Sequence, residues 1–301
     1  MPAEFDLIRT LAAAARPDPR APLGIGDDAA VLNLTGRPVV CCDLIAEGTH
    51  FPPDTPPKLV GRKALAVNLS DCAAMAATPV AAFVGLLVDR RRGYRYAEAV
   101  MRGLTELAEQ FHVTLAGGDT ATHDGPTSLC VTVVGTCDRE VRRSGARPGD
   151  ALLVTGRLGG SFPSGRHLTF TPRVAEAQAL AAAAELHAMI DLSDGLLADC
   201  GRLCDASGLS AILDAAAAPL ADGAENVKAA LTDGEDFELL FAVSESDAAR
   251  LLDAPPVACG LTRIGTVAAG AGVTVRGADG EPLRFPTAGY EHAFAADPAT
   301  D

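Results

Sequence analysis

Short aspartate motifs at the ends of apolar runs are the features of this sequence that point most directly to chemistry. They are GIGDDAAVL (Asp27 and Asp28), VVCCDLIAEGTHF (Asp43), NLSDCAAM (Asp71), AGGDT (Asp119), MIDLSDGLL (Asp191 and Asp194) and DGEDFELL (Asp236). Loops at element ends often carry catalytic groups, and short carboxylates suit Mg²⁺, which binds a few of them together with phosphate oxygens and water. Because carboxylates that share a cleft repel each other unless a cation lies between them, the joint pattern predicts a metal-bridged phosphate site.

Each motif taken alone has a simpler explanation. Asp and Gly are common in turns, and Asp caps helices. Asp194, which precedes GLLADCGRL, would serve as an N-cap, and Asp28, which precedes AAVL, would serve as a turn residue. The prediction of a phosphate site therefore depends on the motifs occurring together.

The familiar nucleotide motifs are missing. The sequence contains neither a GxxxxGK[ST] P-loop nor the Gly-loop, Lys and H-R-D set of protein kinases. The AGGDT segment is predicted to end a strand in a Gly-Gly turn, whose two glycines would let backbone amides approach a phosphate beside Asp119. Arg142 and Arg143 would add positive charge, although solvated surface arginines are an equally good explanation. His50 in EGTHF is a candidate phosphate contact, with a purely structural histidine as the alternative.

Composition narrows the class of protein. The chain has 301 residues, is 48% hydrophobic and 4% aromatic, and carries a formal charge of −14. This acidity argues against nucleic acid as a partner, and no apolar run approaches the length of a membrane span. The N-terminus is typical of an amphipathic helix rather than a signal peptide, so we expect a cytoplasmic protein. Eight cysteines without a CxxC pair indicate free thiols in a reducing compartment.

The order of predicted elements indicates two halves of similar size. Strands alternate with helices up to a polar segment with Pro and Gly at 142–150, and a fresh strand, ALLVTG, then begins a second series of strands and helices. We predict an N-terminal domain over 1–140 and a C-terminal domain over 141–301.

The motifs together resemble those of thiamine-monophosphate kinases, in the same order from about residue 5 to residue 294. GRKALAVNLSDCAAMAATP, LAGGDT, RRSGARPGD and MIDLSDGLLAD carry most of the resemblance. Parts of the pattern also occur in aminoimidazole-ribotide synthetase, selenophosphate synthetase and a hydrogenase-maturation protein. EGTHF with NLSD, GEDFELL and the final GYEH favour the thiamine branch.

The resemblance implies an α+β protein with the two-domain PurM-like fold. Its N-terminal α/β sheet domain would bind ATP and Mg²⁺ and form a homodimer, and a C-terminal α+β domain would fold against it. ATP would lie between the domains, and its γ-phosphoryl group would pass directly to thiamine monophosphate to give thiamine diphosphate. Several Mg²⁺ ions are implied, with Asp27, Asp43, Asp71, Asp119, Asp191 and Asp194 as ligands. The implied ATP contacts are Gly118, Asp119, Arg143 and Ser193, and the implied substrate contacts are His50, Glu235 and Tyr290.

Because a phosphate monoester is already ionised near neutral pH, in-line attack on ATP needs no general base, and we assign none. Three departures from the family pattern stand out: Cys41 and Cys42 replace hydroxyl residues before Asp43, Asp233 replaces a glycine, and the segment 161–173 is short. Two alternatives remain at this stage. One is another ATP-dependent enzyme of the PurM superfamily, and the other is a catalytically silent ATP-binding homologue.

Overall fold

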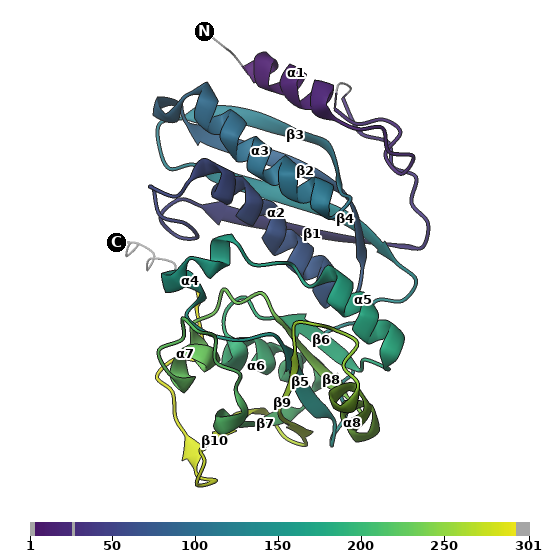
Figure 1. The fold of residues 1–301 in the computed structure, drawn as a ribbon, viewed down its shortest axis with the longest axis vertical. Coiled ribbons are helices and arrows are strands. Elements are labelled where there is room, and N and C mark those ends of the chain that lie inside the picture. Colours follow the sequence, from purple (N-terminus) through teal and green to yellow (C-terminus); the bar gives the residue numbers. More distant parts are fainter. Residues whose placement is uncertain (1–3, 26–27, 293–301) are drawn as a thin grey trace, which may run out of the picture.

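The computed structural model describes residues 4–25 and 28–292, and it consists of two sheet units joined end to end (Figure 1). The elements of the first half are α1 (Glu4–Ala14), β1 (Arg37–Ala46), α2 (Pro57–Ala74), β2 (Thr78–Asp89), η1 (Arg90–Arg92), α3 (Tyr94–Gln110), β3 (Thr114–His123) and β4 (Ser128–Cys137). Those of the second are β5 (Ala151–Thr155), α4 (Ser161–Ser164), η2 (Arg166–Leu168), α5 (Val174–Ala183), β6 (Ala188–Asp191), α6 (Leu196–Ser207), β7 (Ser210–Asp214), η3 (Ala215–Ala217), α7 (Val227–Thr232), β8 (Leu239–Val243), α8 (Glu245–Asp253), β9 (Leu261–Ala268), β10 (Gly272–Arg276) and β11 (Pro282–Leu283). Two halves that each combine a sheet with helices confirm the predicted α+β class.

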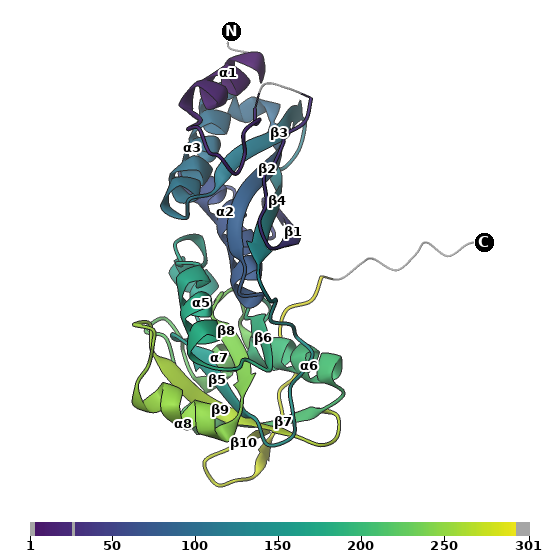
Figure 2. The ribbon, with the colours of Figure 1, turned by 90° about the vertical axis from the view of Figure 1, so that its right-hand side faces the viewer.

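The N-terminal sheet has helices on one face only. Its strand order is β1-β4-β2-β3, with β2 and β3 parallel and the other pairs antiparallel. Figure 2 shows α2 and α3 on the same side of this sheet. On β1 the alternate residues Val40 and Leu44 face away from the helices and are 62% and 59% exposed, so this strand presents an apolar outer surface.

Helix α2 is the central element of the molecule. Most of its residues are buried, because it packs on the N-terminal sheet and on α3 and also reaches α5 and β6 of the second half. Two glycines allow the α2 and α3 backbones to touch. A Cβ at Gly61 would lie 1.8 Å from the Val100 carbonyl oxygen, and one at Gly103 would lie 1.9 Å from that of Lys58. Larger residues at either position would push the helices apart.

The C-terminal sheet is buried on both faces near its centre. Its order is β11-β10-β7-β9-β5-β8-β6, and only β10 and β7 pair in parallel. Leu153 and Phe241 belong to the same apolar cluster as α2 and α5, whereas Leu152 and Leu240 belong to a second cluster with α6. The first cluster is thus continuous across both halves and fixes the end of α2 against the second sheet.

Two details differ from the sequence expectations. The glycines of AGGDT do not form a turn, because β3 continues through them and Gly118 pairs with Val84 on β2. Strands β10 and β11 were not predicted. The two sheets lie on either side of residue 140, and the domain limits 1–140 and 141–301 remain a prediction. Among the described residues, no helix has both the length and the apolar character needed to cross a bilayer.

Candidate active site

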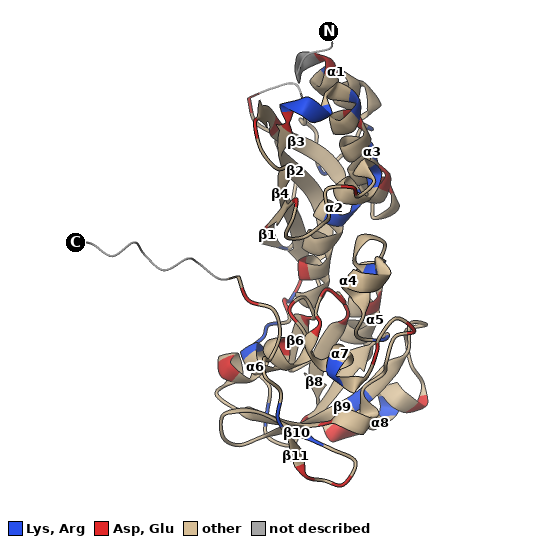
Figure 3. Ribbon diagram, turned by 90° about the vertical axis from the view of Figure 1, so that its left-hand side faces the viewer, with Lys and Arg blue, Asp and Glu red and all other residues tan. Residues whose placement is uncertain are grey.

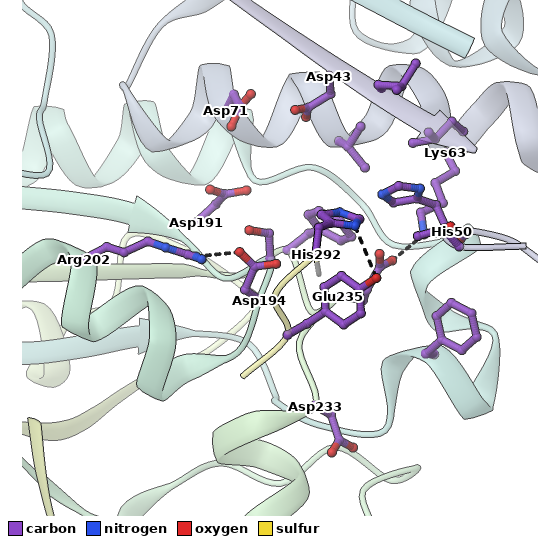
Figure 4. Close-up of a pocket in the computed structure, with 18 of the residues that line it drawn as sticks. Asp43, His50, Lys63, Asp71, Asp191, Asp194, Arg202, Asp233, Glu235 and His292 are labelled. Carbon is purple, nitrogen blue, oxygen red and sulfur yellow. Dashed lines mark hydrogen bonds and ion pairs between the residues drawn. The ribbon is translucent and has the colours of Figure 1, made fainter. Parts of the chain in front are cut away.

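A cavity of about 600 Å³ lies where the two halves meet. Acidic segments gather at this junction (Figure 3). The cavity is lined by the end of β1 and the loop after it, by α2, and by loops of the C-terminal half. The lining residues with polar or aromatic side chains include Asp43, His50, Lys63, Asp71, Arg143, Phe162, Asp191, Ser193, Asp194, Arg202, Asp233, Glu235, Tyr290 and His292. Most of these residues form two groups, which lie at opposite ends of the cavity in Figure 4.

The first group, called here the aspartate end, consists of Asp43, Asp71, Asp191 and Asp194. Asp43 and Asp71 face the cavity from β1 and α2 (Figure 4). Asp191 faces it from the end of β6, and Asp194 from the turn that follows. The hydroxyl of Ser70 on α2 donates to Oδ2 of Asp191 at 2.7 Å, which joins the two halves at this end. The sequence motifs NLSD and DLSD are therefore brought together by packing of the halves.

Burial and mutual repulsion dominate the electrostatics of the aspartate end. Burial, followed by the charges of Asp191 and Asp194, raises the pKa of Asp43 to about 6. Burial, followed by the charges of Asp191 and Asp43, raises the pKa of Asp71 to about 8. The pKa of Asp191 is also raised, chiefly by burial. Such shifts mean that the ionised forms lack sufficient positive charge around them.

Two arginines border the aspartate end. Nη1 of Arg202 lies 2.6 Å from Oδ2 of Asp194 and also pairs with the buried Asp199. Arg143 lines the cavity and its charge acts to lower the pKa of Asp71, although the net shift of Asp71 is upward. The arginines therefore compensate only part of the negative charge.

The residues at this end fit magnesium bound jointly with a phosphate substrate. Within 4–25 and 28–292, no group of three or more acidic, His or Cys side chains is arranged to hold a metal by itself. Mg²⁺ commonly takes one or two carboxylates and completes its shell with water and substrate phosphates. The uncompensated carboxylates around one cavity are the donor set that this mode of binding requires.

The second group, called here the Glu235 end, consists of His50, Lys63, Phe162, Glu235, Tyr290 and His292. Lys63 forms an ion pair with Glu235. Burial acts to raise the pKa of Glu235, but hydrogen bonding with His167 and the Lys63 charge outweigh burial, and the pKa lies below its ordinary value. Glu235 is thus a carboxylate with its own internal cation.

Rings gather around this carboxylate. The backbone N–H of Ala46 donates to Nδ1 of His50 at 3.0 Å, so the proton of the neutral ring is on Nε2. The ring centroids of His50 and His292 are 5.4 Å apart, and Tyr290 meets His292 edge-on at 4.9 Å. Tyr290 remains 49% exposed. An anionic group beside exposed aromatic surface suits a cationic heterocycle.

The cavity contains most of the residues singled out from the sequence. Asp43, His50, Asp71, Arg143, Asp191, Ser193, Asp194, Glu235 and Tyr290 line it. Gly118 and Asp119 do not, since they are exposed positions of β3. Asp27 lies outside the described residues. The roles of all of these residues remain predictions.

Sequence reasoning missed Lys63, Phe162, Arg202 and His292. Lys63 had a usable signal: it stands between Val60 and Val67 at helical spacing, and a lysine on the apolar face of a helix is unusual. Arg202 lies within a predicted helix, where an arginine is ordinarily interpreted as part of the solvent-exposed face. Phe162 and His292 offered no local pattern.

The departures from the family pattern occupy different places. Cys41 and Cys42 do not line this cavity; Cys41 is 3.3 Å from the Asn68 carbonyl oxygen, and Cys42 lies on the outer face of β1 with its sulfur 3.4 Å from that of Cys130. Asp233 does line it, and its Oδ2 accepts from the Gly160 N–H at 3.2 Å. Asp233 therefore anchors the loop that begins the short segment 161–173.

Comparisons with known proteins identify relatives of this chain in sequence and in fold. Models of the AIR synthase related protein match the chain, the N-terminal domain over residues 26–137 and the C-terminal domain over 147–278. The thiamine-monophosphate kinase of Rhodopirellula baltica is 38% identical over 293 residues, which cover 91% of this chain and 92% of that protein. The crystal structure of thiamine-monophosphate kinase from Stenotrophomonas maltophilia K279a has a TM-score of 0.77 at 34% identity, covering 93% of this chain and 96% of that one. AaThiL complexed with AMPPCP and TMP has a TM-score of 0.76 at 28% identity, covering 96% and 97%.

Proposed function

The chain belongs to the thiamine-monophosphate kinase family, and we propose that it transfers the γ-phosphoryl group of ATP to thiamine monophosphate, giving thiamine diphosphate and ADP. The observation that carries the proposal is a single cavity with a carboxylate-rich end and a Glu235–aromatic end. The first suits metal-bound phosphates, and the second suits the cationic rings of thiamine. The AaThiL structure with AMPPCP and TMP supports the same pair of substrates.

Magnesium is part of the proposal. Asp43, Asp71, Asp191 and Asp194 would hold Mg²⁺ with the help of phosphate oxygens, and the metal would neutralise charge on the donor and acceptor phosphates. Asp27 and Asp119 remain predicted ligands, the first outside the described residues and the second outside this cavity. We expect several Mg²⁺ ions to bind, as the family resemblance implies.

The remaining residues bind and orient the two anionic reactants. Arg143 and Ser193, next to the aspartate end, would contact the ATP phosphates, with Gly118 as a further predicted contact. His50, Glu235 and Tyr290 would hold the acceptor so that a terminal phosphate oxygen is in line with the γ-phosphorus. The acceptor phosphate is itself the nucleophile and is ionised near neutral pH, so positioning and charge neutralisation suffice without a general base.

We also propose a homodimer and a cytoplasmic location. The apolar outer face of β1, with Val40 and Leu44 exposed, supports association of the N-terminal sheet with that of a second copy. The acidic composition and the eight free cysteines are consistent with a reducing compartment.

The test of the function is direct. Purified protein with ATP, Mg²⁺ and thiamine monophosphate should produce ADP and thiamine diphosphate in equal amounts, measured by chromatography. A parallel reaction with formylglycinamidine ribotide should give no ADP. Absence of thiamine diphosphate from well-folded protein would show that the proposed function is wrong, and metal-dependent ATP binding without turnover would favour a silent homologue.

A further inference from the structure

Lys63 is a charged residue in an unusual place. It lies within α2 on the helix face that carries Val60 and Val67, and its side chain is 0% exposed. Burying an ammonium group is costly unless it is paired and hydrogen-bonded. The position therefore calls for a reason beyond packing.

The ammonium group of Lys63 has three partners, and they come from three separate segments. Nζ donates to the carbonyl oxygen of His50 at 2.7 Å, lies 2.9 Å from Nδ1 of His167, and pairs with the carboxylate of Glu235. An ammonium group has three N–H donors; His50 and Glu235 accept two of them, and Nδ1 of His167 lies within hydrogen-bond distance of Nζ. Lys63 consequently acts through its partners rather than on a bound substrate.

Glu235 is the charged partner of Lys63, and it lines the cavity. Its backbone has φ of +58°, the left-handed region that non-glycine residues occupy at a cost. Its N–H donates to the carbonyl oxygen of Ser193 at 2.7 Å, which links it to the turn that carries Asp194. The carboxylate is thus held at both its backbone and its charged end.

The same helix also fixes the segment opposite Glu235. Arg62 donates to the carbonyl oxygens of Leu168, at 3.1 Å, and Phe170, while Lys63 contacts His167. The ring of Phe162 stacks on His167 with centroids 4.3 Å apart and lines the cavity. Two consecutive residues of α2 therefore order the wall of the Glu235 end.

We propose that Lys63 is a positioning residue for the acceptor substrate: its ammonium group holds the Glu235 carboxylate at the cavity wall, where Glu235 meets the cationic heterocycle of the acceptor. This inference rests on the proposed function. It assigns the specificity of the Glu235 end to a residue of the N-terminal half acting on residues of the C-terminal half. Nucleotide binding at the aspartate end should be independent of it.

A purely structural role is the competing explanation, and the chain contains a matched control. Arg173, which precedes α5, forms a largely buried ion pair with Glu238 of the motif that contains Glu235, with Nη2 of Arg173 2.6 Å from Oε1 of Glu238. Neither residue lines the cavity. Arg173→Met therefore breaks a similar pair, in the same part of the fold, without altering Glu235.

The experiment compares Lys63→Met, Glu235→Gln, the double variant and Arg173→Met with the wild type in steady-state kinetics. Melting temperatures are recorded for each protein. The double variant buries no unpaired charge, so it provides a folded reference if Lys63→Met alone is too unstable. KM for thiamine monophosphate should rise about tenfold or more in Lys63→Met and in Glu235→Gln, which is the loss expected for one charged hydrogen bond. In the double variant, KM for thiamine monophosphate should be no higher than in the single variant with the larger increase. KM for ATP should stay within about twofold of the wild-type value in all of them.

Each outcome has a defined meaning. Wild-type acceptor KM in folded Lys63→Met, or additive effects in the double variant, would overturn the role of Lys63 while leaving the kinase function intact. An equal rise in acceptor KM in Arg173→Met would show that the effect comes from a general loss of order in the fold, and it would also overturn the role of Lys63. If the wild type itself makes no thiamine diphosphate, the proposed function fails first, and this inference fails with it.

Discussion

The two ends of the cavity both bury carboxylates, yet the pKa shifts have opposite signs. At the aspartate end the pKa of Asp71 rises to about 8, whereas at the other end the pKa of Glu235 falls below its ordinary value. Burial acts upward at both places, so burial is not the difference. The difference is that Lys63 lies against Glu235, while Asp43, Asp71 and Asp191 mainly face each other (Figure 4).

The comparison indicates what each end must obtain from outside. At the Glu235 end the protein itself supplies a cation, Lys63, that keeps the carboxylate ionised, and the carboxylate is ready to meet a cationic aromatic substrate. At the aspartate end, the ionised forms of the carboxylates are unfavourable until a cation binds among them. In the proposed reaction this arrangement would be an advantage, because cations held by these carboxylates would also neutralise the charge of the two phosphates.

The largest expected effect comes from removing a carboxylate at the aspartate end. Asp71→Asn should lower kcat about a thousandfold, comparable to the loss of a central electrostatic group in other active sites, while the far-ultraviolet circular dichroism stays unchanged. The metal-free variant should melt above the metal-free wild type, since repulsion is reduced. Asp222→Asn, at a fully exposed position, is the matched control. Turnover near that of the wild type in Asp71→Asn would remove the contrast between the two ends.

Removing the metal should reveal the contrast between the two ends of the cavity in the thermal stability of the protein. A carboxyl whose pKa is raised on folding adds stability at pH values below its unfolded pKa and loses that contribution as the pH rises through the folded pKa. With Asp43 at about 6 and Asp71 at about 8, the melting temperature in chelator should fall between pH 4 and pH 8. A fixed magnesium concentration, set at 100 times the Kd measured at pH 8, should restore about 2.7 kcal/mol at that pH and less toward pH 4, where the carboxylates are protonated. A pH-independent effect of magnesium would contradict the assignment.

A smaller effect is expected at the arginine beside the aspartate end. Arg143→Gln should raise KM for ATP about tenfold, the loss of one charged contact to phosphate, with little change in KM for thiamine monophosphate. Steady-state kinetics with each substrate varied in turn separates the two values. Arg142→Gln is the control, because Arg142 is paired with Glu140 and does not line the cavity. Equal changes in both KM values would indicate that Arg143 affects the whole cavity.

The smallest effect belongs to the aromatic surface of the Glu235 end. Tyr290→Ala should raise KM for thiamine monophosphate about fivefold, within the range of one partly exposed cation–π contact, and should leave KM for ATP unchanged. Tyr290→Phe keeps the ring and should restore most of the affinity. If the phenylalanine variant is as impaired as the alanine variant, the hydroxyl that lies 3.3 Å from Nδ1 of His292 is the important group instead.

Much of the fold was accessible from the sequence, because its strands and helices carry clear periodic patterns. The segment YRYAEAVMRGLTELAEQF, for example, places Val100, Leu104, Leu107 and Phe111 on one stripe. The first three are buried in α3, and Phe111, just after the helix, is half-buried. The assembly of the aspartate end was not accessible from local patterns. Asp71 and Asp191 meet only because α2 extends beyond its own sheet onto the second one, and the sequence predicted this only through the family resemblance.

The expectation for AGGDT shows how a local signal misled. Two consecutive glycines after an apolar run normally indicate a turn. In the structure the glycine is required by close strand contact instead, since a Cβ at Gly118 would lie 2.1 Å from the Val84 carbonyl oxygen. Lys63 was missed for a related reason, because its partners are contributed by segments more than a hundred residues away along the chain as well as by the nearby His50.

The burial of Lys63 also gives this protein a built-in chemical reporter. The chain has three lysines, and Lys58 and Lys228 lie at exposed positions while Lys63 is enclosed. An amine-acylating reagent should therefore modify the first two rapidly and Lys63 only when α2 separates from the Glu235 loop. The rate of Lys63 acylation, followed by peptide mass spectrometry, would measure how often the two halves part and how far each substrate suppresses that opening.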